Sequence, residues 1–135
     1  MSEVPTVVLD ASVGVKWFKD EAGSDKARGL YLQAVRADVR LVAPTHFLHE
    51  VLSVVKREMG PRAIVEGWGH IQASGIAVVP LSSEVVAEAA TQCEALKCSF
   101  YDALSPACAA LLGATLASAD ARAHGAYPDV LLIGE

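Results

Sequence analysis

The sequence predicts an α/β protein in which helices cover both faces of a mostly parallel sheet, giving a three-layer α/β/α sandwich. Short apolar segments rich in β-branched residues alternate along the chain with longer segments whose apolar residues recur at helical spacing. This alternation favours right-handed crossovers between parallel strands. The chain has 135 residues, 53% of them hydrophobic and 20% charged, so we expect a single domain over residues 1–135 and exclude a disordered chain.

The amino-terminal third of the chain predicts two strands with a helix between them. Residues 4–9 form a short apolar run, interpreted as a strand buried on both faces, which ends at Asp10 where a helix can start. From Ser24 onward, apolar residues at helical spacing alternate with charged ones and predict an amphipathic helix. Residues 40–43 then predict a brief second strand.

The middle of the chain predicts two helices followed by a strand. Pro44 and Thr45 are expected to open a helix whose apolar side chains share one face, and the Gly-Pro pair at 60–61 ends it. Another helix follows to Ser74. The apolar run at 76–81 is interpreted as the third strand.

The carboxy-terminal third continues the alternation. Ser82 or Ser83 caps a helix, and residues 99–112 predict the next one, capped by a serine and stopped by a glycine. Residues 114–119 and 130–133 predict the last two strands. Strands and helices therefore alternate over most of the chain.

Several acidic residues lie where a sheet of this kind gathers functional groups, because ligands bind beyond the carboxyl ends of parallel strands. Asp10 and Asp120 each follow a predicted strand and should lie at that edge, whereas Asp129 precedes its strand and should point the other way. Asp102 falls at the third helical position after the predicted serine cap, near the positive end of the helix dipole. Glu50 lies on the flank of the apolar face of its helix, at the expected rim of the core.

Each of these acids also has a purely structural interpretation. Asp10 and Asp102 suit helix caps, and Glu50 suits a solvated helix face. If Asp10, Glu50, Asp102 and Asp120 converge, like charges about 4 Å apart repel by about 4 kcal/mol at the dielectric of a partly buried site. Carboxylate oxygens select hard cations, so Mg²⁺ or Mn²⁺ is the expected cofactor, and such ions support phosphodiester hydrolysis.

Other function classes lack their motifs in this sequence. It contains no phosphate-binding P-loop, no dinucleotide-binding glycine turn and no nucleophile elbow. The net charge of −5 disfavours bulk attraction of nucleic acid, although a metal-filled acidic site attracts phosphate locally. The cysteines form no metal-clip pattern and are interpreted as buried thiols, and the histidines as surface residues or residues behind the site.

The sequence gives no sign of export or membrane insertion. Met1, Ser2 and Glu3 do not begin a secretory segment, and the apolar runs are short and separated by charges. We therefore expect a cytoplasmic protein with no membrane partner.

Four short segments carry the acidic residues in a recognisable order. They read VVLDAS at 7–12, PTHFLHEVL at 44–52, FYDAL at 100–104 and LASAD at 116–120. Together they resemble the motifs of the PIN-domain family, in particular the VapC-like ribonuclease toxins of type II toxin–antitoxin systems. The resemblance includes VKWF at 15–18 and runs from about Val4 to Ile133. It implies a single PIN-like domain with a three-layer α/β/α fold.

The resemblance also implies an activity and partners. The chain would be a Mg²⁺- or Mn²⁺-dependent endoribonuclease that hydrolyses RNA phosphodiester bonds as the toxin of a toxin–antitoxin pair. Asp10, Asp102 and Asp120 would hold the metal directly or through water, and Glu50 would orient or activate the attacking water. Such proteins usually form homodimers and are silenced by a cognate antitoxin protein.

Three further residues bear on the resemblance. Ser12 and Ser118 occupy positions where the family often has a hydroxyl, so each is expected to bond a carboxylate or a water on the metal. Ser118 replaces the more common threonine but keeps the hydroxyl. Pro106 lies four residues after Asp102 inside a predicted helix, where it removes a backbone donor and favours a kink that would alter the setting of Asp102.

Two alternative functions remain open from the sequence. One is a catalytically weak PIN-fold binding module that engages an antitoxin-like partner without RNA turnover, for which Pro106 is the sequence support. The other is a phosphotransferase that uses Asp10 as a nucleophile, as haloacid-dehalogenase-like phosphatases do. That pattern requires a second aspartate where Ser12 stands.

Overall fold

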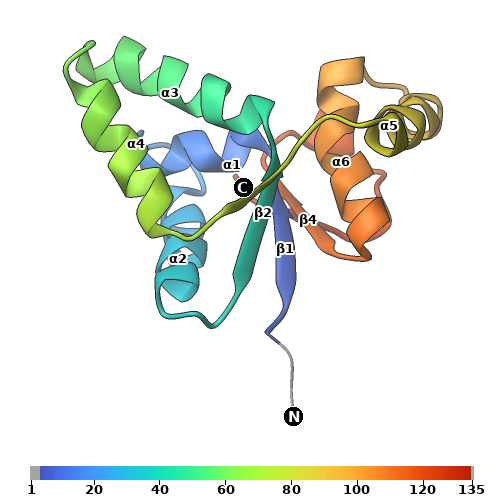
Figure 1. Cartoon of the computed structure of the whole chain (residues 1–135), viewed down its shortest axis with the longest axis horizontal. Helices are drawn as coiled ribbons and strands as arrows, with labels where there is room; N and C mark the ends of the chain where they lie inside the picture. The colour runs from blue at the N-terminus through green and yellow to red at the C-terminus, as the bar shows by residue number, and fades with distance from the viewer. Residues whose placement is uncertain (1–3, 135) are drawn as a thin grey trace.

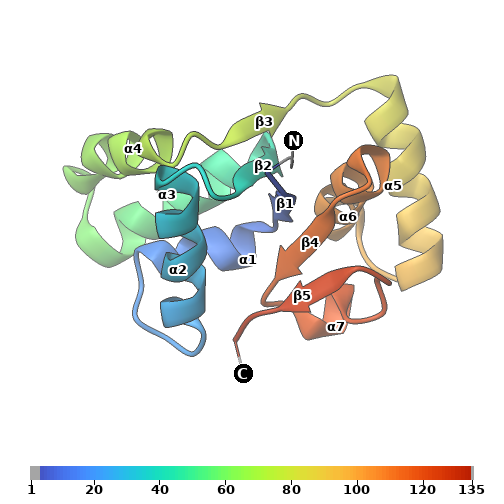
Figure 2. The same ribbon diagram turned by 90° about the horizontal axis from the view of Figure 1, so that it is seen from below.

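The computed structural model describes residues 4–134, and the first three residues of the chain, on which the expectation about export rested, lie outside them. A parallel five-stranded sheet with the strand order β3-β2-β1-β4-β5 forms the middle layer (Figures 1 and 2). The strands are β1 (Thr6–Leu9), β2 (Arg40–Pro44), β3 (Ala77–Val79), β4 (Thr115–Ser118) and β5 (Val130–Leu132). This is the predicted three-layer α/β/α architecture.

The helices divide between the two faces of the sheet. They are α1 (Ala11–Gly14), the 3₁₀ turn η1 (Val15–Trp17), α2 (Ser24–Val35), α3 (His46–Met59), α4 (Ala63–Ala73), α5 (Ser83–Leu96), α6 (Phe100–Leu112) and α7 (Ala121–His124). In Figure 1, α1 to α4 lie on one side of the strands and α5 and α6 on the other. Within residues 4–134, no helix combines the length and the apolar composition needed to cross a membrane.

Strand β1 is central and is buried on both faces, as its apolar run predicts. Val7 and Leu9 belong to the core under α1 to α4, whereas Val8 packs on the opposite face with Cys108 of α6 and Leu116 of β4. Successive side chains of a strand point to opposite faces, so a continuous apolar run can supply both cores. The residue after β1 is therefore attached to the best-packed part of the sheet.

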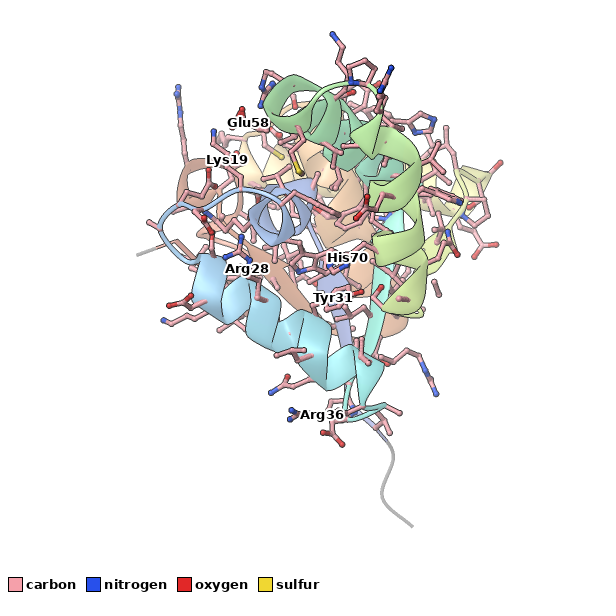
Figure 3. The ribbon with its side chains drawn as sticks, turned by 90° about the vertical axis from the view of Figure 1, so that its left-hand side faces the viewer. Lys19, Arg28, Tyr31, Arg36, Glu58 and His70 are labelled. Carbon is pink, nitrogen blue, oxygen red and sulfur yellow. The ribbon has the colours of Figure 1, made fainter. Side chains whose placement is uncertain are left out.

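The α2–α4 side of the molecule is held together by aromatic rings. The ring of Tyr31 stacks on that of His70 with centroids 4.2 Å apart and planes 3° apart, so the two side chains lie together between α2 and α4 (Figure 3). The Tyr31 hydroxyl also donates to the His70 carbonyl at 2.7 Å. Trp17 packs edge-on against Tyr31 and Phe47 and donates from Nε1 to the Ala27 carbonyl. These contacts fix α1 and η1, and with them the start of the segment that follows β1.

Several predicted element boundaries were wrong, among them the start of the first strand, which lies at Thr6 and not at Val4. Pro44 does not open the helix, because it is the last residue of β2 and pairs in register with Val79. The fixed φ of proline suits an extended chain end as well as a first helical turn, so the sequence pattern did not decide between them. The third strand is shorter than predicted and spans only Ala77–Val79. The short helix α7 after Asp120 was not predicted as an element.

The cysteines are free thiols, but only one of them is fully buried. Cys93 and Cys98 are partly exposed, and Cys108 lies in the core between α6 and the sheet. Burial raises the pKa of the Cys108 thiol to about 11, so it stays protonated at neutral pH. Its role is packing, as expected for a buried thiol.

Candidate active site

The candidate site lies at the carboxyl ends of β1 and β4, where the strand order changes direction. Asp10 directly follows β1, and Asp120 follows β4, which is its parallel neighbour. Both acids therefore lie at the same edge, as the sequence predicts. Asp129 lies at the opposite edge, where it accepts hydrogen bonds from Thr115 Oγ1 at the start of β4. A crevice at such a reversal of strand order is the usual ligand site of an open parallel sheet.

Asp10 is held by neutral donors on both carboxylate oxygens. Oδ2 accepts hydrogen bonds from the Ser12 backbone N–H at 3.1 Å and from the Ser12 hydroxyl at 2.6 Å. Oδ1 accepts a hydrogen bond from the Ser105 hydroxyl at 2.7 Å, across from α6. Asp10 is thus the cap of α1 and is also tied to α6, so the structural role and a role in chemistry are compatible.

Two serine hydroxyls hold the backbone that carries Asp120. The Ser12 hydroxyl accepts a hydrogen bond from the Ala119 N–H at 2.9 Å, and the Ser118 hydroxyl accepts one from the Asp120 N–H at 3.0 Å. Asp120 Oδ1 in turn accepts from the Ala123 N–H and caps α7. Within the described residues the Ser118 hydroxyl contacts this amide and a histidine ring, and it bonds no carboxylate. Its effect on the acids therefore passes through the backbone.

Asp102 occupies the predicted position at the start of α6. It is the third helical residue, and its N–H donates to the hydroxyl of the cap residue Ser99 at 3.1 Å. The helix runs without interruption through Pro106. The backbone carbonyl of Asp102 accepts a hydrogen bond from His124 Nε2 at 2.6 Å. Asp102 therefore keeps the cap geometry that the sequence predicted, despite the proline.

Glu50 and His46 approach the acids from α3. The carboxylate of Glu50 is half exposed, and its Oε1 lies 3.7 Å from His46 Nε2. Partial burial, and then the negative charges of Asp10 and Asp102, raise the pKa of Glu50. Burial lowers the pKa of His46, and the charges of Asp10 and Asp102 oppose that lowering. Both side chains therefore lie within the electrostatic range of these two aspartates.

Asp120 and Asp102 both act on the thiol of Cys98. The pKa of the Cys98 thiol is raised first by burial, then by Cys93 and by the charges of Asp102 and Asp120. Asp10 and Asp102 thus lie within charge range of Glu50, and Asp102 and Asp120 within charge range of Cys98, without gathering into one cluster. Among residues 4–134, no three histidine, cysteine, aspartate or glutamate side chains are close enough to share one metal ion.

The negative charge at this edge has no fixed counter-charge. Within the described part of the chain, none of the ion pairs includes Asp10, Asp102 or Asp120. The buried Nδ1 of His46 also has no hydrogen-bond partner there. A set of uncompensated carboxylate oxygens fits a hard divalent cation such as Mg²⁺ or Mn²⁺ and does not fit zinc, which prefers sulfur and nitrogen ligands.

An open pocket of about 390 Å³ lies beside the acids. Its lining consists of polar and aromatic side chains from the start of α3 and of α6, namely Thr45, His46, His49, Glu50 and Tyr101. A larger pocket, of about 520 Å³, lies between η1, α3 and α4 and includes none of the four acids. The smaller pocket is the one that a substrate at the acidic edge would meet.

Comparison with known proteins identifies the family. A model of the PIN domain matches residues 7–127. The chain belongs to the PIN domain family. This PIN domain superposes on a chain of a toxin–antitoxin complex from Klebsiella pneumoniae with a TM-score of 0.70 and 16% sequence identity, covering 93% of this chain and 95% of that one. It superposes on VapC20 of Mycobacterium tuberculosis, described as a sarcin–ricin loop cleaving toxin, with a TM-score of 0.62 and 18% identity, covering 84% and 87%. No curated protein matches the sequence.

Two side chains that contact the acids of this PIN domain were not predicted as site residues. Ser105 is fully buried and bonds Asp10, and its position three residues after Asp102 on α6 could have indicated it. His124 is also fully buried and bonds Ser118 and the Asp102 carbonyl. The sequence alone offered only its spacing of four residues from Asp120 as a signal.

Proposed function

We propose that this PIN domain is a Mg²⁺- or Mn²⁺-dependent endoribonuclease that acts as the toxin of a toxin–antitoxin pair. The observation that carries the proposal is the acidic strand edge, where Asp10 and Asp102 act on Glu50 and where no ion pair of residues 4–134 includes Asp10, Asp102 or Asp120. Membership of the PIN family and the fold shared with two chains described as toxin–antitoxin or toxin proteins support the same reading.

The four acids would divide the work between metal binding and proton transfer. Asp10, Asp102 and Asp120 would hold the ion directly or through water, so that they need not all contact it, and Glu50 would orient or activate the attacking water. Burial, which is the first cause of the raised pKa of Glu50, favours that role, because a base is most effective when its pKa lies nearer to the working pH. When bound, a divalent ion polarises the phosphodiester and stabilises the charge that develops on its oxygens.

The serine hydroxyls would keep the carboxylates in place during the reaction. Ser12 and Ser105 together donate to both oxygens of Asp10, so the carboxylate cannot rotate freely. Neutral donors of this kind orient a carboxylate while leaving its charge available to a cation. Ser118 acts on Asp120 through the backbone amide.

The decisive experiment is RNA cleavage by the purified full chain with and without a divalent ion. We expect cleavage of labelled RNA with Mg²⁺ or Mn²⁺ and none with a chelator. Asp10→Asn should lower the rate by about 100-fold or more, since the metal contributes several kcal/mol of charge stabilisation. Asp129→Asn, at the opposite edge, is the matched control and should cleave normally. Cleavage that persists in chelator and in Asp10→Asn would refute the proposal.

The proposal extends to partners and location. RNA is the substrate, a cognate antitoxin protein is the inhibitor, and the chain works in the cytoplasm as a homodimer. Expression of the chain should arrest growth, and co-expression of the antitoxin encoded by an adjacent gene should relieve the arrest. Sedimentation analysis of the purified chain tests the homodimer. Growth that continues while wild-type protein accumulates would contradict the toxin assignment without affecting the ribonuclease test.

A further inference from the structure

Pro106 removes one hydrogen bond from the helix turn that carries Asp102. In an α-helix, the carbonyl of each residue accepts from the N–H four residues later. The residue four positions after Asp102 is Pro106, which has no N–H, so the Asp102 carbonyl lacks the usual donor of its own helix. Pro106 is fully buried in α6. A carbonyl without a donor in such a setting would weaken the turn that carries Asp102.

His124 supplies the missing donor from another element. Its Nε2 lies 2.6 Å from the Asp102 carbonyl oxygen, and the ring is completely buried at the end of α7. A carbonyl oxygen can only accept, so Nε2 must carry the proton. The Asp102 carbonyl therefore receives its hydrogen bond from a side chain that lies 22 positions along the chain, whereas the first turn of α6 is closed by its own backbone, from the Ala103 N–H to the Ser99 carbonyl.

The other nitrogen of the same ring continues the connection to Asp120. In the neutral ring, Nδ1 is then an acceptor, and it lies 2.6 Å from the Ser118 hydroxyl, which donates to it. The Ser118 oxygen in turn accepts from the Asp120 N–H at 3.0 Å. An uninterrupted series of hydrogen bonds thus joins the backbone of Asp120 to the backbone of Asp102, with donor and acceptor matched at every step.

We propose that His124 is a positioning residue that sets the separation of Asp102 and Asp120 by replacing the hydrogen bond that Pro106 removes. Its ring hydrogen-bonds the Asp102 carbonyl and the Ser118 hydroxyl, and neither of these groups belongs to a carboxylate. Pro106 and His124 therefore form a coupled pair, because His124 supplies the hydrogen bond that Pro106 removes. The link to metal binding rests on the function proposed above, whereas the coupling of the pair does not.

Two substitutions of His124 separate its two hydrogen bonds. In His124→Gln the side-chain amide can place a donor near the former Nε2, and in His124→Asn the shorter amide reaches only the former Nδ1 position. We expect His124→Asn to weaken Mn²⁺ binding to the full chain, measured by calorimetry, by about tenfold or more, the usual cost of losing a residue that orients metal ligands. His124→Gln should bind Mn²⁺ within about threefold of wild type, because it keeps the donor to Asp102.

The decisive test is rescue by the backbone donor. Pro106→Ala restores an N–H to the helix, so the double variant Pro106→Ala/His124→Asn should recover most of the lost Mn²⁺ affinity. A residue that only filled space would give equal losses in the asparagine and glutamine variants, and no rescue by alanine at 106. Either of those results would overturn the proposal.

Thermal unfolding tests the coupling of Pro106 and His124 even if the protein binds no Mn²⁺. Pro106→Ala should raise the melting temperature of His124→Asn by more than it changes that of the wild type. If His124→Asn does not fold alone, a folded double variant shows the same coupling. If wild-type protein binds no Mn²⁺, the ribonuclease proposal fails while this comparison still decides whether the pair is coupled. Additive effects of the two substitutions on melting temperature would refute the coupling.

Discussion

Asp10 and Glu21 lie close together along the chain, and both carboxylates are held by hydrogen bonds, but the charge on their donors differs. Asp10 accepts from Ser12 and Ser105, which are neutral. Glu21 Oε2 accepts from the nearly buried ammonium group of Lys16 at 2.7 Å. Ser12 and Ser105 orient the Asp10 carboxylate without neutralising its charge. Lys16 both orients and neutralises the Glu21 carboxylate.

The pKa shifts of two glutamates follow this difference. The hydrogen bond from Lys16 is the largest cause that lowers the pKa of Glu21. Glu50, near Asp10 and Asp102, has a pKa that is raised by burial and by the charges of those two acids. The Lys16–Glu21 pair therefore neutralises its own charge, whereas the proposed cation would neutralise the charge of the acidic edge.

The largest difference between the two regions should appear in RNA cleavage. Asp102→Asn removes a proposed metal ligand at the acidic edge and should lower the rate by about 100-fold or more. Glu21→Gln removes an acid from the compensated pair and should leave the rate per folded molecule unchanged. Initial rates on labelled RNA with Mn²⁺ measure both. A comparable loss in the two variants would mean that the acidic edge has no special role.

Stabilisation of the fold by Mn²⁺ should depend on the acidic edge and not on the Lys16–Glu21 pair. An ion that binds only the folded state at 100 times its Kd adds about 2.7 kcal/mol to the free energy of unfolding. Wild type and Glu21→Gln should therefore show a rise in Tm with increasing Mn²⁺, and Asp102→Asn should not. Differential scanning calorimetry over a Mn²⁺ series measures the shift. An equal shift in all three proteins would place the ion elsewhere.

Without metal, a substitution in the Lys16–Glu21 pair should lower the free energy of unfolding more than a substitution at the acidic edge. Glu21→Gln leaves the buried ammonium of Lys16 without its anion, and should lower the free energy of unfolding by about 1–3 kcal/mol. Asp10→Asn keeps one acceptor oxygen for Ser12, its new amide can donate to the Ser105 hydroxyl, and the substitution relieves like-charge repulsion, so its change should stay below about 1 kcal/mol. Urea unfolding of both variants in chelator tests this order, which a larger loss in Asp10→Asn would contradict.

The smallest effects should be opposite pH dependences of the two glutamates. The folded pKa of Glu21 is below its ordinary value of 4.5, so its stabilising contribution is present above that pH and is lost as pH falls through the folded pKa. The folded pKa of Glu50 is above 4.5, so its contribution is present below that pH and is lost as pH rises through the folded pKa.

Substitution by glutamine should reveal these signs. Between pH 4 and pH 7, Glu50→Gln should gain stability relative to wild type and Glu21→Gln should lose it. Because Glu50 is half exposed, we expect its change to stay below about 1 kcal/mol. Urea unfolding at both pH values gives the two differences. Changes of the same sign in the two variants would show that their environments do not differ as described.

Local signals in the sequence predicted the fold and the edge at which the acids lie. A β-branched run before Asp10, a serine cap at Ser99 and a glycine stop at Gly113 depend on nearby residues only, and each prediction of an element from them was confirmed. Parallel strands place their carboxyl ends together, so the positions of Asp10 and Asp120 at one edge followed from the alternation of elements.

Contacts between distant parts of the chain could not be predicted from local signals in the sequence. The hydrogen bond from Ser105 to Asp10 joins residues 95 positions apart, and no local pattern encodes it. His124 was interpreted only as one of several surface or supporting histidines, because its partners belong to α6 and β4. Pro106 signalled a missing donor, but only the folded chain shows which residue replaces it.

The position of β1 in the middle of the sheet has a consequence for hydrogen exchange. Strands pair with β1 on both sides, and side chains cover it on both faces, so its amides should open only when the whole molecule unfolds. Asp10, whose own N–H donates to the Ala117 carbonyl, is anchored to this slowest-exchanging segment. Glu50 is half exposed on α3, so its side chain should be more mobile than that of Asp10.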